Sequence, residues 1–194
     1  MRKRDALDAL ARGMASAQLP LMPANFVFGE GDPDARVMFV GEAPGAREDL
    51  EGRPFVGRSG KLLGEMLVSI GWRREDVYIT NIVKRRPPEN RDPSPEEIAA
   101  YAPYLARQIE IIAPRVIVPL GRFAMNHFLP AAKITRDQGT AFREGDRIIY
   151  PILHPAAAMR GSKMMARFKE SFAGLSQAAR VRMKKESARD TMKK

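Results

Sequence analysis

Three carboxylates stand in one short turn that follows an apolar stretch of the chain. Residues 37–40 form an apolar run typical of a buried strand, and Glu42, Glu48 and Asp49 come soon after it. Turns at the carboxyl ends of strands in open α/β sheets are where ligands bind. Glu42 and Glu48 are therefore candidates for holding or activating a water molecule. The plain alternative is that both are charged residues of a solvated loop.

A single aromatic ring lies on the glycine-rich segment that comes next. Phe55 stands between Gly52 and Gly57. A ring on such a polar loop can stack against a planar ligand. The alternative is an ordinary core phenylalanine. Together with the carboxylates, the ring indicates a site that holds a planar ligand close to a water.

Two further polar side chains follow later apolar runs. Asn81 lies near the end of the run 77–83, and its amide offers one hydrogen-bond donor and one acceptor. His154 directly follows the run 148–153, and a neutral imidazole can donate a hydrogen bond when its other nitrogen accepts one. Asn81 could equally cap the end of a strand. The other histidine, His127, has no motif around it, so we interpret it as structural or solvent-facing.

Alternating apolar runs and amphipathic segments define the elements that must position these residues. Strands are predicted over residues 37–40, 77–83, 116–120 and 148–153, and helices over residues 5–17, 61–70, 95–112, 122–128 and 163–182. The helix at Pro95 has a plausible N-cap in Ser94. This alternation predicts an α/β protein, a three-layer α/β/α sandwich around a central four-stranded, mainly parallel sheet. We expect one domain over residues 1–180 and a basic C-terminal tail, 181–194, in which helix gives way to disorder.

The parallel sheet also predicts where the candidate residues meet. The carboxyl ends of parallel strands lie at one edge of the sheet. We therefore expect six side chains to converge there: Glu42, Glu48, Phe55, Asn81, Asn90 and His154.

Composition narrows the class of protein. The 194 residues are 44% hydrophobic, and no apolar run is long enough to cross a membrane. No secretory signal is visible, so a cytoplasmic protein without membrane contact is expected. The chain has no cysteine, which excludes disulfides, a thiol nucleophile and thiolate-bound metal. We expect neither a cofactor nor a metal.

The chain is strongly basic, with a formal net charge of +10. Such a balance favours a polyanionic partner, and nucleic acid is the first candidate. The alternative is that the charge serves solubility. Basic residues flank the loops named above and suit phosphate contacts: Arg53, Arg58, Lys84, Arg85, Arg86, Arg91 and Arg160.

Five motifs in order resemble those of family-four uracil-DNA glycosylases. They cover roughly residues 27–160, and each alone is weak whereas the ordered set is specific. The motifs are Gly41-Glu42-Ala43-Pro44-Gly45 with Glu48-Asp49, Gly52-x-Pro54-Phe55-Val56-Gly57-x-x-Gly60, Tyr78-Ile79-Thr80-Asn81-Ile82-Val83-Lys84, Arg86-Pro87-Pro88-x-Asn90-Arg91, and His154-Pro155-Ala156. The resemblance implies cleavage of the N-glycosidic bond of uracil in DNA after the base has left the stack.

The resemblance also assigns expected roles to the candidate residues. Phe55 would stack on the flipped base, Asn81 would read uracil O4 and N3–H, and His154 would lie against O2. Ala43 and Asn90 would line the pocket. Ala43 cannot hold water through its side chain, so Glu42, Glu48 or backbone groups would have to do so. Arg58, Lys84, Arg86 and Arg91 are expected to contact DNA because they flank these loops. The resemblance implies that Met159 could act as a wedge in the duplex, with Arg160 on a phosphate; the plain alternative is a loop that packs on its own domain.

The chain departs from the family at one conspicuous point. Family-four enzymes resemble iron–sulfur proteins with four cysteine ligands. Here the later two ligand positions read Arg85 and Tyr101, and the earlier two fall near Met14 and Ala17. A cluster cannot be held, so packing must replace it. No histidine lies in residues 85–93, where a cluster-containing relative carries one that traps the sugar, so turnover is expected.

Three functions stay open at this stage. The first is a monomeric, cluster-free uracil-DNA glycosylase that acts on single- or double-stranded DNA. The second is a DNA- or damage-binding module that retains the pocket without catalysis. The third is a glycosylase for another deaminated base, such as hypoxanthine or xanthine.

Overall fold

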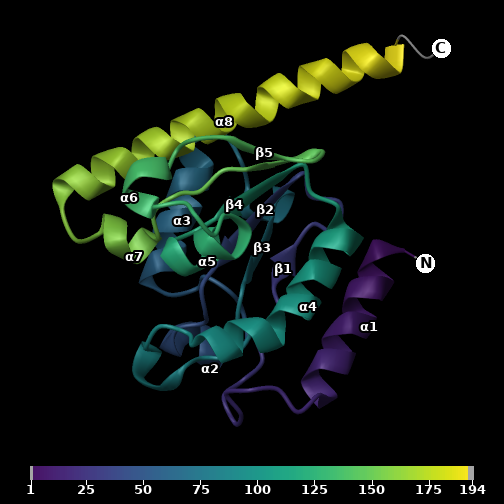
Figure 1. Ribbon diagram of the computed structural model, residues 1–194, viewed down its shortest axis with the longest axis vertical. Helices are drawn as coiled ribbons and strands as arrows, with labels where there is room; N and C mark the ends of the chain where they lie inside the picture. Colours follow the sequence, from purple (N-terminus) through teal and green to yellow (C-terminus); the bar gives the residue numbers. More distant parts are fainter. Residues whose placement is uncertain (1, 192–194) are drawn as a thin grey trace.

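A six-stranded sheet forms the centre of the molecule, in the order β1-β3-β2-β4-β6-β5 (Figure 1). The computed structural model describes residues 2–191, and side chains as far as residue 179. The strands are β1 (Glu30–Gly31), β2 (Val37–Gly41), β3 (Tyr78–Asn81), β4 (Val116–Pro119), β5 (Phe142–Glu144) and β6 (Arg147–Ile149). The inner four are parallel to one another, whereas β1 and β5 pair antiparallel at the edges.

The four predicted strands are the four inner ones, and the prediction of four strands in all was wrong. The two additional strands span only two and three residues. Segments of this length carry no period that could distinguish them from loop. The predicted strands at 77–83 and 148–153 are also shorter in the structure, although single backbone bonds to the neighbouring strands continue at Ile82 and Ile152.

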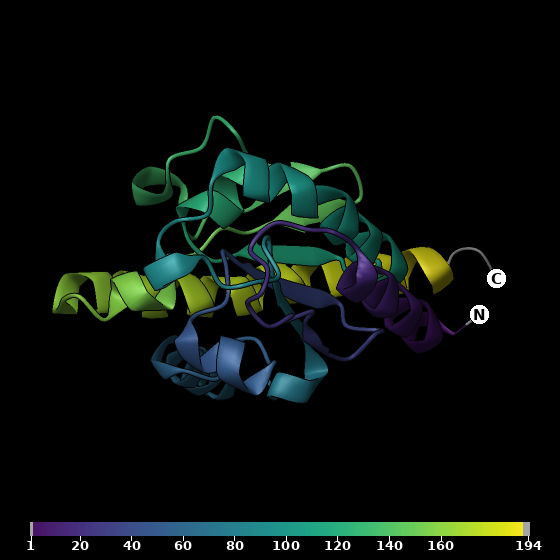
Figure 2. The same cartoon turned by 90° about the horizontal axis from the view of Figure 1, so that it is seen from below.

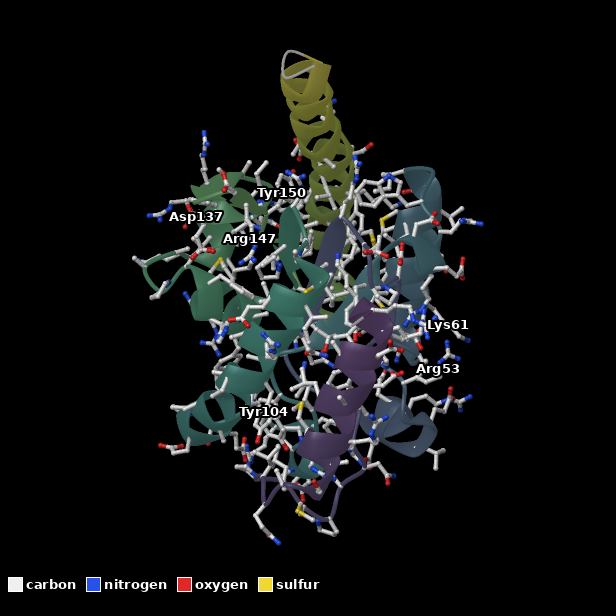
Figure 3. The ribbon with its side chains drawn as sticks, turned by 90° about the vertical axis from the view of Figure 1, so that its right-hand side faces the viewer. Arg53, Lys61, Tyr104, Asp137, Arg147 and Tyr150 are labelled. Carbon is white, nitrogen blue, oxygen red and sulfur yellow. The ribbon has the colours of Figure 1, made fainter. Side chains whose placement is uncertain are left out.

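Alternate side chains of β2 face two different cores, which makes the fold a three-layer sandwich. Val37 and Phe39 pack with residues of α3 (Arg58–Ser69) and α8 (Ser162–Thr191). Met38 and Val40 pack on the opposite face with α1 (Lys3–Ser16), α4 (Pro95–Ile112) and α5 (Arg122–Phe128). Figure 2 shows α3 and α4 on opposite sides of the sheet, and Figure 3 shows α1 beside α4. A strand buried on both faces explains the uninterrupted apolar run.

Local signals explain where α4 begins. Ser94 Oγ accepts a hydrogen bond from the backbone N–H of Glu97, and the Glu97 carboxylate accepts one from the Ser94 N–H. This reciprocal pair satisfies donors that the first helical turn leaves open. Pro95 takes the first helical position, where it has no N–H to lose. Both features agree with the prediction for this helix.

Several helices differ from the sequence-based expectation. The turn after β2 contains α2 (Ala46–Glu51), and α6 (Ile134–Asp137) and α7 (Pro155–Ala158) are short helices that were not predicted. The backbone of α8 continues to Thr191 instead of ending at residue 182. The tail predicted at 181–194 thus falls partly on α8 and partly on residues 192–194, which lie outside the described residues; its disorder stays a prediction. Over residues 2–191, no helix is long and apolar enough to cross a membrane.

Candidate active site

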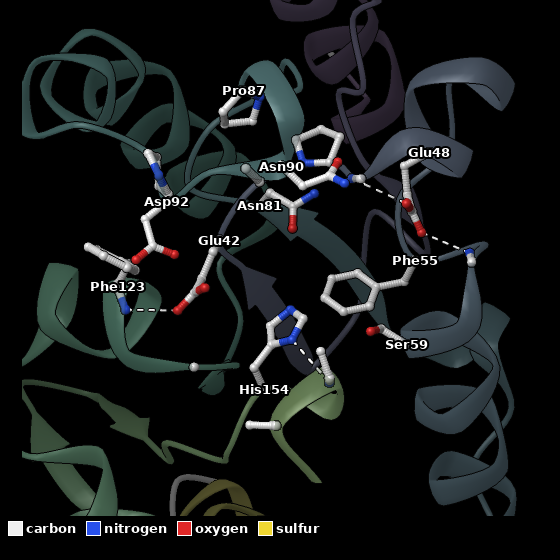
Figure 4. A pocket seen from close by; sticks show the side chains of 18 of the residues that line it. Glu42, Glu48, Phe55, Ser59, Asn81, Pro87, Asn90, Asp92, Phe123 and His154 are labelled. Carbon is white, nitrogen blue, oxygen red and sulfur yellow. Dashed lines mark hydrogen bonds between the residues drawn. The ribbon is translucent and has the colours of Figure 1, made fainter. Parts of the chain in front are cut away.

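A cavity of about 740 Å³ opens at the carboxyl edge of the inner strands. All six side chains expected at this edge line it, together with Ala43. Glu42 and Asn81 come from the ends of β2 and β3, Phe55 from the loop before α3, and His154 from the start of α7 (Figure 4). The parallel topology therefore brings together residues more than 100 positions apart in the sequence.

Glu42 is a partly buried carboxylate anchored at one oxygen. Its Oε1 accepts a hydrogen bond of 2.9 Å from the backbone N–H of Phe123, in the first turn of α5. Burial, reinforced by the nearby Asp92, raises the pKa of Glu42, while its backbone contacts and Arg122 act in the opposite direction. A carboxylate with one oxygen fixed and a raised pKa is suited to hold a water and accept its proton.

Glu48 instead braces two loops. Its Oε1 accepts from the backbone N–H groups of Val56 (2.9 Å) and Gly57 (2.8 Å), and its Oε2 accepts from Gly45 (3.2 Å). These bonds tie the turn after β2 to the loop that carries Phe55. The contacts support a positioning role for Glu48 and give no support to the expected activation of water.

Phe55 is buried among protein atoms, yet its ring forms part of the cavity wall. Its backbone has a φ of 50°, a left-handed conformation that is uncommon for a bulky residue and concentrates at functional sites. Gly60 makes the loop possible, since a Cβ there would lie 1.8 Å from the Phe55 carbonyl oxygen. The Phe55 and His154 ring centroids are 6.0 Å apart. The space beside these rings suits a flat ligand.

The Asn81 amide faces this space without a partner. The residue is 2% exposed, and among the described residues no group forms a hydrogen bond with its side chain. An amide that opens on a cavity and has no protein partner leaves its hydrogen bonds to a ligand or to water. Asn81 can therefore offer both an N–H donor and an oxygen acceptor to a bound molecule.

His154 is held as a neutral hydrogen-bond donor. Its Nδ1 accepts a bond of 3.2 Å from the Ala156 N–H, so the ring proton resides on Nε2. Burial lowers the pKa of His154 to about 4, against an opposing effect of Glu48. The imidazole is thus uncharged at neutral pH and can donate from Nε2. His127 lies away from the cavity, with its ring edge against Phe128.

Arginines surround the mouth of the cavity. Arg58 and Arg160 are exposed lining residues, and Arg91 also lines it while its guanidinium forms two bonds to Glu97. Arg86 is half-buried and donates to Asn90 Oδ1 at 2.8 Å, so it orders a lining residue. Met159 is 37% exposed and stands beside Arg160.

The prediction that Lys84 contacts DNA was wrong. Lys84 is fully buried, and its Nζ donates to Thr80 Oγ1, the Asn81 carbonyl and Gln108 Oε1, each at 2.6 Å. A side chain enclosed in this way cannot reach a phosphate. Its position in a run of basic residues suggested a surface location that the fold does not give it.

Sequence reasoning also missed one wall of the cavity. Gly121, Arg122 and Phe123 line it from the loop after β4 and the start of α5. Asp92 lines it too, and its Oδ2 lies 3.3 Å from Arg122 Nη2. The signal was present, because Gly121 directly follows a predicted strand. The loops after the other three strands carry proline and polar residues, and for this reason only those three were predicted to form the site.

The residues at the positions of the implied cluster ligands do not fit an iron–sulfur group. Tyr101 is buried and its hydroxyl donates to the Pro20 carbonyl at 2.7 Å, while Arg85 Nη1 donates to the Ala24 carbonyl. Met14 is buried in the same core cluster as Tyr101. Side chains that fill this space and bond to the backbone leave no thiolate donors.

Fold and site together define a class: an α/β/α sandwich protein with a cavity of mixed polar and apolar lining at the carboxyl edge of its parallel strands. The profile of the uracil DNA glycosylase superfamily matches residues 28–176. The chain belongs to this superfamily.

Curated relatives agree with this assignment. The chain is 47% identical over 180 residues to a type-4 uracil-DNA glycosylase of Archaeoglobus fulgidus, a match that covers 87% of this chain and 90% of that protein. It is 51% identical over 145 residues to a type-4 uracil-DNA glycosylase of Thermotoga maritima (73% and 76% covered). It is 35% identical over 147 residues to a type-5 uracil-DNA glycosylase of Pyrobaculum aerophilum (65% and 63% covered).

Proposed function

We propose that this protein is a monofunctional DNA glycosylase that hydrolyses the N-glycosidic bond of uracil in DNA. One observation carries the proposal: a free Asn81 amide, the Phe55 ring and a neutral, donating His154 line one cavity. The type-4 relatives, which are named uracil-DNA glycosylases, support the same activity. A single chain forms the cavity, so the protein is proposed to act as a monomer.

Asn81 and Phe55 account for recognition of the base. Uracil presents an acceptor at O4 and a donor at N3–H, and one side-chain amide satisfies both. Cytosine presents the opposite pattern, so an amide held in the orientation that reads uracil would leave two buried groups unpaired. The Phe55 ring supplies a stacking surface for a base that has left the helix.

His154 and Glu42 account for the chemistry. As the bond between C1′ and N1 breaks, its electron pair moves to the uracil ring, and the Nε2–H of His154 stabilises the charge on O2. A water held by Glu42 attacks C1′ and loses its proton, which Glu42 accepts. The uracil anion takes up a proton from solvent and Glu42 returns its proton to solvent, so the products are free uracil and an abasic deoxyribose.

The residues around the cavity favour hydrolysis over attack by an amine. The described lining residues include five arginines and no lysine, and arginine is not a nucleophile at neutral pH. Arg58 and Arg160 are proposed to contact phosphates, and Met159 to enter the duplex as the base leaves. Arg91 is a weaker candidate because Glu97 already holds its guanidinium.

The test is a panel of oligonucleotides that contain uracil, hypoxanthine, xanthine or a thymine mismatch, scored for abasic sites. We expect abasic sites at uracil, and losses on the order of a hundredfold or more for Asn81→Ala and His154→Ala. His127→Ala is the matched control, since this histidine lies outside the cavity. Salt-dependent DNA binding without abasic product would instead identify a binding module. Product at hypoxanthine or xanthine alone would identify another base.

A further inference from the structure

Lys84 is the most completely enclosed charged side chain near the cavity. It follows β3 by three residues and is 0% exposed. Its Nζ has three acceptors at 2.6 Å: Thr80 Oγ1, the Asn81 carbonyl oxygen and Gln108 Oε1. Two of the three belong to the last residues of β3. The lysine is therefore hydrogen-bonded to the end of the strand that carries Asn81.

The surrounding bonds identify the protonation state for which this site is built. Thr80 Oγ1 donates to the Phe28 carbonyl, so it must accept from Lys84. Gln108 Nε2 also donates to the Phe28 carbonyl, which leaves Gln108 Oε1 to accept. Three acceptors require three N–H groups, and only the ammonium form has them. Burial acts against this form and lowers the pKa of Lys84.

Folding stability alone does not explain a buried ammonium group at this position. A buried charge has a desolvation penalty of about several kcal/mol, and an apolar side chain of similar volume is often equally stable. The Asn81 side chain, by contrast, can read a ligand only if the backbone that carries it is fixed. No other described residue forms a hydrogen bond with its amide, so its direction depends on packing over Gly41 and on how its backbone is held.

We infer that Lys84 is a positioning residue for base recognition: through the Asn81 carbonyl it fixes the end of β3 and thereby aims the Asn81 amide into the cavity. The inference rests on the proposed function, in which this amide reads uracil. Lys84 itself does not line the cavity and acts only through Asn81.

The adjacent residue provides a matched control. Arg85 is also a buried cation, with 6% of its surface exposed. Its guanidinium donates to the Ala24 carbonyl and lies over the Phe26 ring, and no hydrogen bond among the described residues joins it to Asn81. Replacing either residue by methionine removes a buried cation at nearly the same place in the chain. Only Lys84→Met also removes a bond to the Asn81 carbonyl at the end of β3.

The experiment is a pair of double-mutant cycles on kcat/KM with a uracil oligonucleotide, corrected for the folded fraction. We expect Lys84→Met to lower kcat/KM on the order of tenfold, or about 1.4 kcal/mol of transition-state stabilisation. In the background of Asn81→Ala, Lys84→Met should lower kcat/KM almost no further, because the side chain through which Lys84 acts on the uracil is already absent. The effect of Arg85→Met should instead multiply with that of Asn81→Ala.

Two results would overturn the inference: an unchanged kcat/KM in Lys84→Met, or losses that multiply between Lys84→Met and Asn81→Ala. If Lys84→Met does not fold, Lys84→Gln enters the same cycle. The NMR signal of the Asn81 side-chain amide, identified by its loss in Asn81→Ala, gives a readout in the free protein; it should shift with the Lys84 variants and stay in place with Arg85→Met. Failure of the proposed function would differ, because the wild-type protein would then release no uracil.

Discussion

Gly41 and Asn81 face each other across the parallel pair β2–β3, and the missing side chain of one makes room for the side chain of the other. A Cβ on Gly41 would lie 2.3 Å from Asn81 Oδ1 and 2.6 Å from two carbon atoms of the Phe55 ring. The residue proposed to read the base and the residue proposed to stack on it therefore both rest over one glycine. Close approach, and not backbone conformation, requires glycine here.

Gly41→Ala should disable the site while the protein stays folded. The new methyl group must push Asn81 or Phe55 aside, so we expect kcat/KM on uracil to fall on the order of a hundredfold. Gly64→Ala is the control, because nothing lies within 4 Å of a Cβ at this position of α3. The control should keep its activity and gain roughly 0.5–1 kcal/mol in the free energy of unfolding. Equal activity of the two variants would contradict the geometry.

The pH dependence of kcat should report Glu42. Its raised pKa places the acid limb of the profile at higher pH than an ordinary glutamate would give, because activity needs the carboxylate. Asp92→Asn removes a negative charge that raises this pKa, so the limb should move to lower pH. Arg122→Met removes a positive charge that lowers it, so the limb should move to higher pH. Shifts in the opposite directions would exclude Glu42 as the titrating group.

His154 should make stability depend on pH in a defined window. Burial lowers its pKa from 6.5 to about 4 on folding, so between these values the unfolded chain binds more protons than the native protein. The contribution is complete above pH 6.5 and is lost as the pH falls toward 4, by at most about 3 kcal/mol. Urea unfolding across this range, compared with His154→Gln, measures it. A variant with the same pH slope as the wild type would refute the assignment.

Tyr101 should stabilise the fold through its hydroxyl. Tyr101→Phe removes the bond to the Pro20 carbonyl and leaves that acceptor without its partner, so we expect a loss of about 1–2 kcal/mol in the free energy of unfolding. Tyr104, on the same helix and labelled in Figure 3, forms no side-chain hydrogen bond with any described residue and serves as the control. Tyr104→Phe should change stability by less than about 0.5 kcal/mol. Similar losses of stability in both variants would show that the hydrogen bond of the Tyr101 hydroxyl does not stabilise the fold.

Arg160 should contribute to DNA affinity in a salt-dependent way. Arg160→Gln is expected to raise KM and to lower the slope of log KM against log salt by about one. Arg73→Gln is the comparison, because Arg73 is exposed but bonds to Asp76 away from the cavity. An unchanged slope of log KM against log salt in Arg160→Gln would show that Arg160 does not contact a phosphate.

Periodicity and local signals were enough for the framework of the fold. The run at residues 37–40 is buried on both faces, and Ser94 and Pro95 begin α4 as expected. The edge strands were not predictable, because β1 and β5 are too short to show a period. The convergence of the Glu42, Asn81 and His154 side chains followed from parallel topology, since the carboxyl ends of such strands share one edge.

The sequence by itself determined which residue types were available and the edge of the sheet where they would meet. Only the tertiary structure decided what each one touches. It gave the Glu48 carboxylate three backbone N–H partners, which favour a positioning role over the expected one as a water ligand. It moved Lys84 from the surface to the interior and added Asp92 to the cavity wall. The physical reason is that a motif specifies residue type and spacing, whereas burial and hydrogen-bond partners come from elements distant in the chain.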